Sequence, residues 1–185
     1  NIRMPMIQIS EAEMRQAFID LCNLDSKTLI KSNSFTSRYP YKASKMDEYI
    51  DMNKTGLKAS NYFHQETRWL CDSMNSPSPY RVWHTERFRL TLFNALWSLK
   101  HKEINESKLR STIGLRKYIA AQFSPASAKA IFERFNSKRV LDFSSGWGDR
   151  LLAFASCEGT EHYTGIDPNE ALLEGYMAQI EAYGV

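Results

Sequence analysis

The sequence lacks any long apolar run. No stretch of the 185 residues reaches the roughly 20 apolar residues that a membrane-spanning helix needs. The N-terminal sequence NIRMPMIQISEAEM has no basic segment followed by the apolar core of a secretory signal. With 43% hydrophobic residues, the chain is still able to bury a core. These features predict a globular, cytoplasmic protein without a membrane segment.

Cysteine is also scarce. Cys22, Cys71 and Cys157 are far apart in the sequence, and no CxxC pair occurs. An odd number of widely spaced thiols supports neither a disulfide framework nor a zinc site. The four histidines are scattered, and none has a second ligand at the spacing of a metal site. We therefore expect no bound metal.

Positive charge is nearly absent from the last quarter of the chain. Residues 140–185 carry a net charge of −7 with one Lys or Arg, whereas residues 1–139 carry +10. A basic segment of this size attracts polyanions such as nucleic acids. The same residues would also occur if the basic side chains lay on solvent-exposed helix faces and the aromatic side chains in the core. Basic and aromatic residues alternate in two stretches, which give the candidate nucleic-acid-binding residues Arg38, Tyr39, Lys42, Arg81, Trp83 and Arg87.

Periodic apolar residues predict a basic, mainly helical N-terminal region over residues 1–117. Ser10 and Glu13 have the spacing of a capping box, which predicts a helix over residues 11–24. The remaining helices of this region are expected over residues 62–74, 85–99 and 108–123, with a loop over residues 25–44.

Ser124 followed by Pro125 predicts the start of a further helix, because the serine oxygen can cap it and proline suits the first helical position. The spacing of its apolar residues predicts an inward face made of Ala128, Ile131, Phe132 and Phe135.

The pattern changes to β-α-β-α order at residue 139. Residues 139–143 and 162–167 read as strands, and residues 149–156 and 168–185 as helices. This order predicts a parallel sheet with a crossover helix, and ligands of such sheets bind beyond the carboxyl ends of the strands. The predicted fold class is α/β, with a helical N-terminal region followed by the first half of a Rossmann-like domain over residues 118–185.

Two glycines and two carboxylates lie at the ends of these strands. Gly146 and Gly148 let the chain turn tightly and bring its backbone against a ligand. Asp142 ends the first strand, and Asp167 ends the second, where a carboxylate can accept hydrogen bonds from both ribose hydroxyls. The arrangement predicts a site for an adenosine-containing cofactor. A nicotinamide dinucleotide fits less well, because Leu151 replaces the third glycine of its fingerprint.

The sequence DFSSGWG, residues 142–148, resembles motif I of the class I S-adenosylmethionine-dependent methyltransferases. GIDPN, residues 165–169, resembles the ribose-binding end of their second strand. Upstream, QFSP, residues 122–125, resembles motif X of the phage and prokaryotic DNA methyltransferases of the adenine-N6 type, in which that motif precedes motif I. The resemblance implies S-adenosylmethionine as cofactor. It would contact Phe123 and Pro125 on its methionyl side, Asp142, Gly146, Trp147 and Gly148 at its amino-acid portion, Asp167 at its ribose, and also Ser144 and Pro168.

The same resemblance implies methyl transfer to an exocyclic amine of a nucleic-acid base, such as adenine N6 in DNA. Phe143 and Ser144 depart from the proline and phenylalanine that the family has after the motif I acid. The catalytic tetrapeptide of the family, Asp or Asn followed by Pro-Pro and an aromatic, does not occur in the sequence. We therefore expect a further chain or chain segment to complete the domain, and the catalytic residues stay unassigned.

Three other functions remain open. The chain could be a non-catalytic nucleic-acid-binding or scaffold subunit that retains the methyltransferase fold. It could be a nicotinamide- or nucleotide-binding enzyme. A methyltransferase that acts on a protein or a small molecule would have the same cofactor-binding features.

Overall fold

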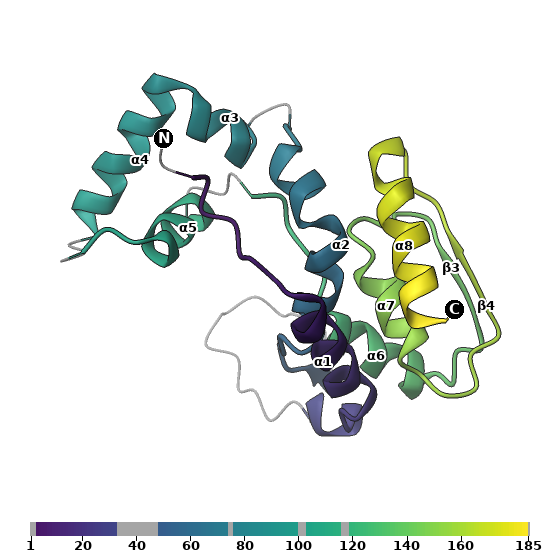
Figure 1. The fold of residues 1–185 in the computed structure, drawn as a ribbon. Helices are drawn as coiled ribbons and strands as arrows, with labels where there is room; N and C mark the ends of the chain where they lie inside the picture. Colours follow the sequence, from purple (N-terminus) through teal and green to yellow (C-terminus); the bar gives the residue numbers. More distant parts are fainter. Residues whose placement is uncertain (1–2, 33–47, 74–75, 100–102, 116–118, 185) are drawn as a thin grey trace, which may run out of the picture. The chain divides into compact units, whose positions relative to one another are not determined.

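The computed structural model describes residues 3–32, 48–73, 76–99, 103–115 and 119–184 (Figure 1). The chain forms two compact units, and each unit is made of two separate parts of the sequence. Unit 1 comprises residues 1–9 and 64–121, and unit 2 comprises residues 10–63 and 122–185. Among the described residues, no helix is both long and apolar enough to cross a membrane.

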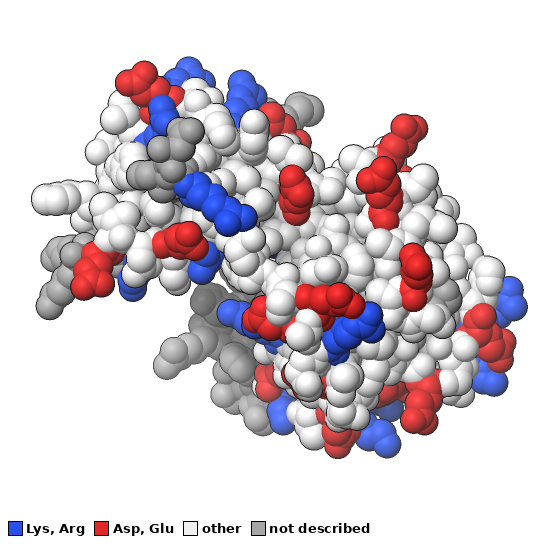
Figure 2. Space-filling model, in the orientation of Figure 1, with Lys and Arg blue, Asp and Glu red and all other residues white. Residues whose placement is uncertain are grey.

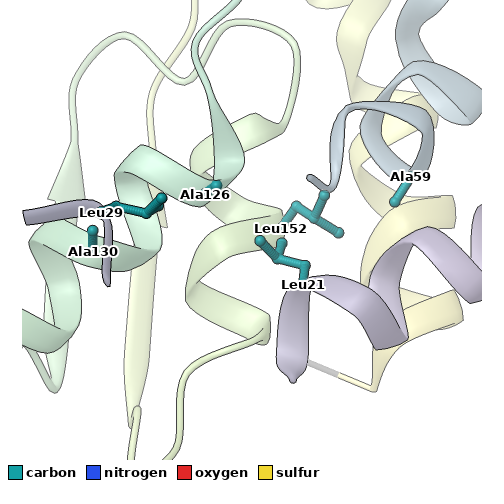
Figure 3. Close-up of a cluster of buried hydrophobic side chains, with 6 residues drawn as sticks. All are labelled: Leu21, Leu29, Ala59, Ala126, Ala130 and Leu152. Atoms are coloured by element: carbon teal, nitrogen blue, oxygen red, sulfur yellow. The ribbon is translucent and has the colours of Figure 1, made fainter. Parts of the chain in front are cut away.

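The units divide the chain differently from the sequence prediction. The pattern predicts one boundary near residue 117, whereas the structure groups residues 10–63 with the C-terminal part. Figure 3 shows the reason, because Leu21 and Ala59 lie in the same buried cluster as Ala126 and Leu152. Local periodicity identifies which helix face is apolar but not which distant helix will cover it.

Unit 1 is helical. It contains the second half of α2 (Leu57–Leu70), followed by α3 (Pro79–His84), α4 (Glu86–Ser98) and α5 (Glu106–Leu115). The short helix α3 was not predicted, although Ser78 caps it and Pro79 takes its first position. The buried core of unit 1 consists of Trp69, Trp83, Leu92, Leu96, Leu109 and Ile113.

Unit 2 begins with α1 (Glu11–Cys22), as the sequence predicts. The capping box is present, since the Ser10 hydroxyl accepts from the Glu13 amide and the Glu13 carboxylate accepts from the Ser10 amide at 3.0 Å. The expected loop after this helix instead starts with ordered structure. The short 3-10 helix η1 (Ser26–Leu29) leads into β1 (Ile30–Ser32), which pairs antiparallel with β2 (Glu48–Ile50).

Helix α6 (Pro125–Arg134) starts where the Ser-Pro pair predicts. The Ser124 hydroxyl accepts from the Ser127 amide at 3.1 Å, and Pro125 occupies the first position. The predicted inward face is wrong in part. Phe135 is 75% exposed, and the helix is instead buried through small residues that include Ala126 and Ala130.

The β-α-β-α order of the last part is confirmed. It consists of β3 (Arg139–Asp142), α7 (Asp149–Ala155), β4 (His162–Gly165), the 3-10 helix η2 (Glu170–Leu172) and α8 (Leu173–Tyr183). Strands β3 and β4 are parallel, with Asp142 opposite Gly165. The chain is therefore a mostly helical α/β protein with two small two-stranded sheets, and the described residues contain no larger Rossmann sheet.

Within the described part of the chain, helices cover the β3-β4 sheet on one side only. Helices α7 and α8 lie on that side in Figure 1, and the Phe154 ring of α7 lies 5.3 Å from the Tyr163 ring of β4. On the opposite side, Leu141, Phe143 and Ile166 are 65%, 79% and 53% exposed. Parallel sheets are usually buried on both faces, so the exposure of this apolar face is unusual.

Candidate functional site

The chain turns sharply between β3 and α7. Gly146 and Gly148 have φ angles of +58° and +71°, in the left-handed region that only glycine enters without strain. The sequence-based reason for two glycines here is therefore supported by the backbone. Gly146 is half-buried and Gly148 is buried, so of the two only Gly146 reaches the surface of the turn.

Asp167 connects this turn to the end of β4. One carboxylate oxygen accepts from the Gly146 amide at 2.8 Å, and the other accepts from the Asn169 amide at 2.9 Å. A carboxylate has about four acceptor positions, so at least two remain for a ligand. Asp167 is partly exposed, and it can therefore accept hydrogen bonds from two neighbouring hydroxyls.

Asp142 is held more completely by the protein. Its Oδ2 accepts from Arg150 Nε at 2.6 Å and from the Tyr163 hydroxyl at 2.5 Å, and its Oδ1 accepts from the Ser144 amide at 3.2 Å. Burial by itself would raise the pKa of Asp142, but these hydrogen bonds and the Arg150 charge lower it below its usual range. Asp142 is therefore a carboxylate at neutral pH, with one acceptor position left.

Tyr163 acts as a hydroxyl donor in this cluster. Burial and its hydrogen bond to the Asp142 carboxylate both raise the pKa of Tyr163. The phenol therefore stays protonated and donates a hydrogen bond to Asp142. This arrangement fixes the end of β3 against the neighbouring strand.

Helix α8 supplies two residues to the turn that the sequence analysis missed. The Tyr176 hydroxyl donates to the Gly146 carbonyl oxygen, and Gln179 Nε2 donates to the Gly148 carbonyl oxygen at 2.8 Å. Gln179 is completely buried. Their spacing of three places both on one helix face, and polar residues on the inward face of the predicted helix could have indicated them.

The segment before α6 reaches the same turn. Gln122 Nε2 donates to Asp149 Oδ1 at 2.9 Å, and the Ser60 hydroxyl donates to the same oxygen at 2.5 Å. Asp149 is 2% exposed, although such a position at a helix start is more often a surface cap. The Phe123 ring lies 5.1 Å from the Arg150 guanidinium. The structure thus places the QFSP segment beside the DFSSGWG turn, which the sequence could not establish.

The other predicted cofactor residues lie at different depths. Pro125 is buried at the start of α6, and Phe123 is 40% exposed. In the turn, Ser144 is exposed and Trp147 is half-buried. Pro168 is exposed and directly follows Asp167. Pro125 thus serves the start of the helix, and the other four present surface near the turn or at the end of β4.

A cavity of about 330 Å³ lies close to the turn but follows β4. It is lined by residues at both ends of this strand, His162 and Gly165, and by Leu151, Phe154 and Ile180 of the covering helices. Neither Asp142 nor Asp167 lines it. Ser145 of the turn and Tyr176 of α8 also line the cavity, which therefore extends from the edge of β4 to the glycine turn without including the two carboxylates.

The candidate nucleic-acid residues have different outcomes. Arg38, Tyr39 and Lys42 lie outside the described residues. Trp83 is only 8% exposed and belongs to the core of unit 1, so its expected role in stacking on bases is corrected to a packing role. Arg81 and Arg87 are exposed. Arg81 Nη1 lies 3.5 Å from an Asp72 oxygen.

Comparisons of the chain with models of protein families, with curated proteins and with solved structures find no match.

Proposed function

We propose that this chain carries the cofactor-binding part of an S-adenosylmethionine-dependent methyltransferase that acts on nucleic acid. The observation that carries the proposal is the link between the glycine turn and the neighbouring strand end. The amide of Gly146, in the turn between β3 and α7, donates to Asp167, two residues past the end of β4, at 2.8 Å. In open parallel sheets, this edge beyond the carboxyl ends is where ligands bind.

The polar groups at this edge suit an adenosine-containing ligand that has no phosphate. Asp142 and Asp167 are acceptors, and a carboxylate repels a pyrophosphate but accepts from ribose hydroxyls. Asp167 has two acceptor positions left after its bonds to Gly146 and Asn169. Asp167 would hold the ribose, and the turn over residues 144–148 would contact the amino-acid portion.

The bound cofactor would supply an electrophilic methyl group on a sulfonium. The chain would hold the methyl group in line with the target amine. Holding two reactants in this way lowers the activation free energy of methyl transfer, because their translational and rotational entropy is already lost on binding. Phe123, whose ring lies 5.1 Å from the Arg150 guanidinium, would exclude water from the methionyl side. A base in a duplex would have to leave its stack to reach such a site.

The charge of unit 1 supports a nucleic-acid substrate. Unit 1 contains 11 Lys or Arg and 5 Asp or Glu, a net charge of +6, whereas unit 2 has a net charge of −3. Figure 2 shows only acidic charged side chains over the region of α8, which contains Glu174 and Glu181 and no basic residue. A polyanion would therefore be attracted to unit 1 and not to this surface of unit 2.

The bare face of the β3-β4 sheet supports a larger α/β domain. Leu141, Phe143 and Ile166 would be covered by further helices, and the edge of β4 beside the 330 Å³ cavity would pair with a further strand. We propose that the missing elements of the same methyltransferase domain, in a further chain or chain segment, provide this cover. The group that positions the target amine would come with them.

The cofactor assignment predicts a strong effect of Asp167→Ala on binding. We expect the chain to bind S-adenosylmethionine in isothermal titration calorimetry, and the variant to bind at least about tenfold more weakly. The reason is the loss of a ribose contact worth about 1.5–3 kcal/mol. Glu170→Ala removes an exposed carboxylate nearby and should leave the affinity unchanged. A folded parent chain that does not bind would contradict the assignment, as would equal losses in the two variants.

The substrate assignment predicts that Arg81 and Arg87 contact phosphates. The double variant Arg81→Glu/Arg87→Glu should bind a single-stranded DNA oligonucleotide more weakly in fluorescence anisotropy. The slope of log affinity against log salt should become shallower by about 1.4, because two counterions fewer are released. The matched control Lys27→Glu/Lys31→Glu reverses two exposed charges of unit 2. Similar slopes for the two double variants would show that the DNA does not contact Arg81 and Arg87.

A further inference from the structure

Arg150 occupies a central position between the parts of the candidate site. Its Nε donates to Asp142 at 2.6 Å, and its Nη2 donates to the Ser144 carbonyl oxygen. The guanidinium lies 5.1 Å from the centre of the Phe123 ring. The side chain is 22% exposed. Arg150 is therefore held from three directions while part of it still reaches the surface.

The guanidinium has donors left for a ligand. It carries five N–H groups, and its Nη1 has no hydrogen-bond partner within the described part of the chain. Because Asp142, Ser144 and Phe123 already fix the side chain, little conformational entropy is lost when a ligand binds. A planar, fixed guanidinium suits a carboxylate, which it can bind through two parallel hydrogen bonds.

Arg150 is also the single basic residue in a strongly acidic sequence. It is the one Lys or Arg among residues 140–185, which contain eight Asp or Glu. The carboxylates of Asp142 and Asp149 both act on its charge. Among residues 140–185, Arg150 is therefore the one cation that can bind an anionic group beside the turn.

We propose that Arg150 binds the carboxylate of the amino-acid portion of the ligand. This inference rests on the proposed function, in which the ligand ends in an α-amino acid. Asp142, the ion-pair partner of Arg150, has one acceptor position left, and this position would accept a hydrogen bond from the ammonium of the ligand's α-amino acid. The pair would thus match both charges of the zwitterion, and Arg150 would select ligands that carry the amino-acid end over those that lack it.

Two ligands test this inference. S-Adenosylhomocysteine carries the amino-acid end, and 5′-methylthioadenosine has the same nucleoside and thioether without it. We expect Arg150→Met to weaken S-adenosylhomocysteine at least about tenfold in calorimetry, as for one charged hydrogen-bonded contact, and to change 5′-methylthioadenosine less than about twofold. Arg150→Lys, which keeps the charge but not the planar fork, should have an intermediate effect.

The matched control is Tyr163→Phe. It removes another hydrogen bond to Asp142 while leaving Arg150 in place, so it reports any effect that acts through Asp142 alone. Tyr163→Phe should not discriminate between the two ligands. If Arg150→Met weakens both ligands equally, or neither, the role of Arg150 is overturned while the cofactor site stands. If the folded parent binds neither ligand, the proposed function itself fails.

Discussion

Lys129→Met should lower the free energy of unfolding by about 3–5 kcal/mol, as expected when a partner of a buried charge network is removed. Lys129 is 2% exposed, and its Nζ donates to the carbonyl oxygens of Leu21 at 2.8 Å, Cys22 at 2.7 Å and Ser156 at 3.2 Å. These carbonyls belong to the ends of α1 and α7, where helices leave acceptors unpaired. The ammonium thus joins α6 to the ends of two other helices.

Methionine keeps most of the volume of lysine but cannot donate a hydrogen bond or carry a charge. The loss would therefore report the three carbonyls and the Glu133 carboxylate, which lies 3.5 Å from Nζ, rather than a cavity. The measurement is urea denaturation followed by circular dichroism. Lys138→Met is the control, because Lys138 lies 3.4 Å from Glu161 and both side chains are more than half exposed. It should cost less than about 1 kcal/mol. Equal losses for the two variants would contradict the role given to Lys129.

Asp149→Ala should cost about 2–4 kcal/mol of unfolding free energy. The substitution removes the buried acceptor of the Ser60 hydroxyl and of the Gln122 amide, and an unsatisfied buried polar group costs about 1–3 kcal/mol. Asp149→Asn keeps an acceptor oxygen of the same shape and should cost clearly less. Urea denaturation of the two variants under the same conditions gives the comparison.

The same pair of variants connects stability to the candidate site. Asp149 fastens Gln122, and therefore the adjoining Phe123, to the start of α7. Limited proteolysis should cut near residues 119–123 faster in Asp149→Ala than in the parent, because this segment loses its buried anchor. If Asp149→Asn is as destabilising as Asp149→Ala, the charge of Asp149 matters more than its hydrogen bonds, and the anchoring role is wrong.

Local signals in the sequence predicted much of the secondary structure. The capping box of Ser10 and Glu13, the Ser124-Pro125 helix start and the β-α-β-α order after residue 139 are all present in the structure. The positive φ angles of Gly146 and Gly148 agree with the turn expected between β3 and α7. These features depend on residues close together in the chain, so spacing and residue type are enough to find them.

The surroundings of the site residues could not be predicted in this way. Trp83 sits in a stretch typical of an exposed basic and aromatic surface, yet the helices of unit 1 bury it. Asp149 has the position of an ordinary helix cap, yet Ser60 and Gln122 enclose it. Whether such a residue is buried depends on which helix packs over it, and that information is not local.

The sequence by itself therefore determined the start of α1, the start of α6 and the β-α-β-α order after residue 139. It also determined where the chain turns on glycine and which carboxylates lie at the ends of the two parallel strands. Only the tertiary structure decided which of these groups meet. Ser60 reaches Asp149 across 89 positions of sequence, and Lys129 reaches Leu21 across 108. Periodicity and capping act over a few residues. Contacts such as these form only when apolar faces from distant parts of the sequence pack into one core. That packing also decides how deeply each polar group is buried and which charge it carries.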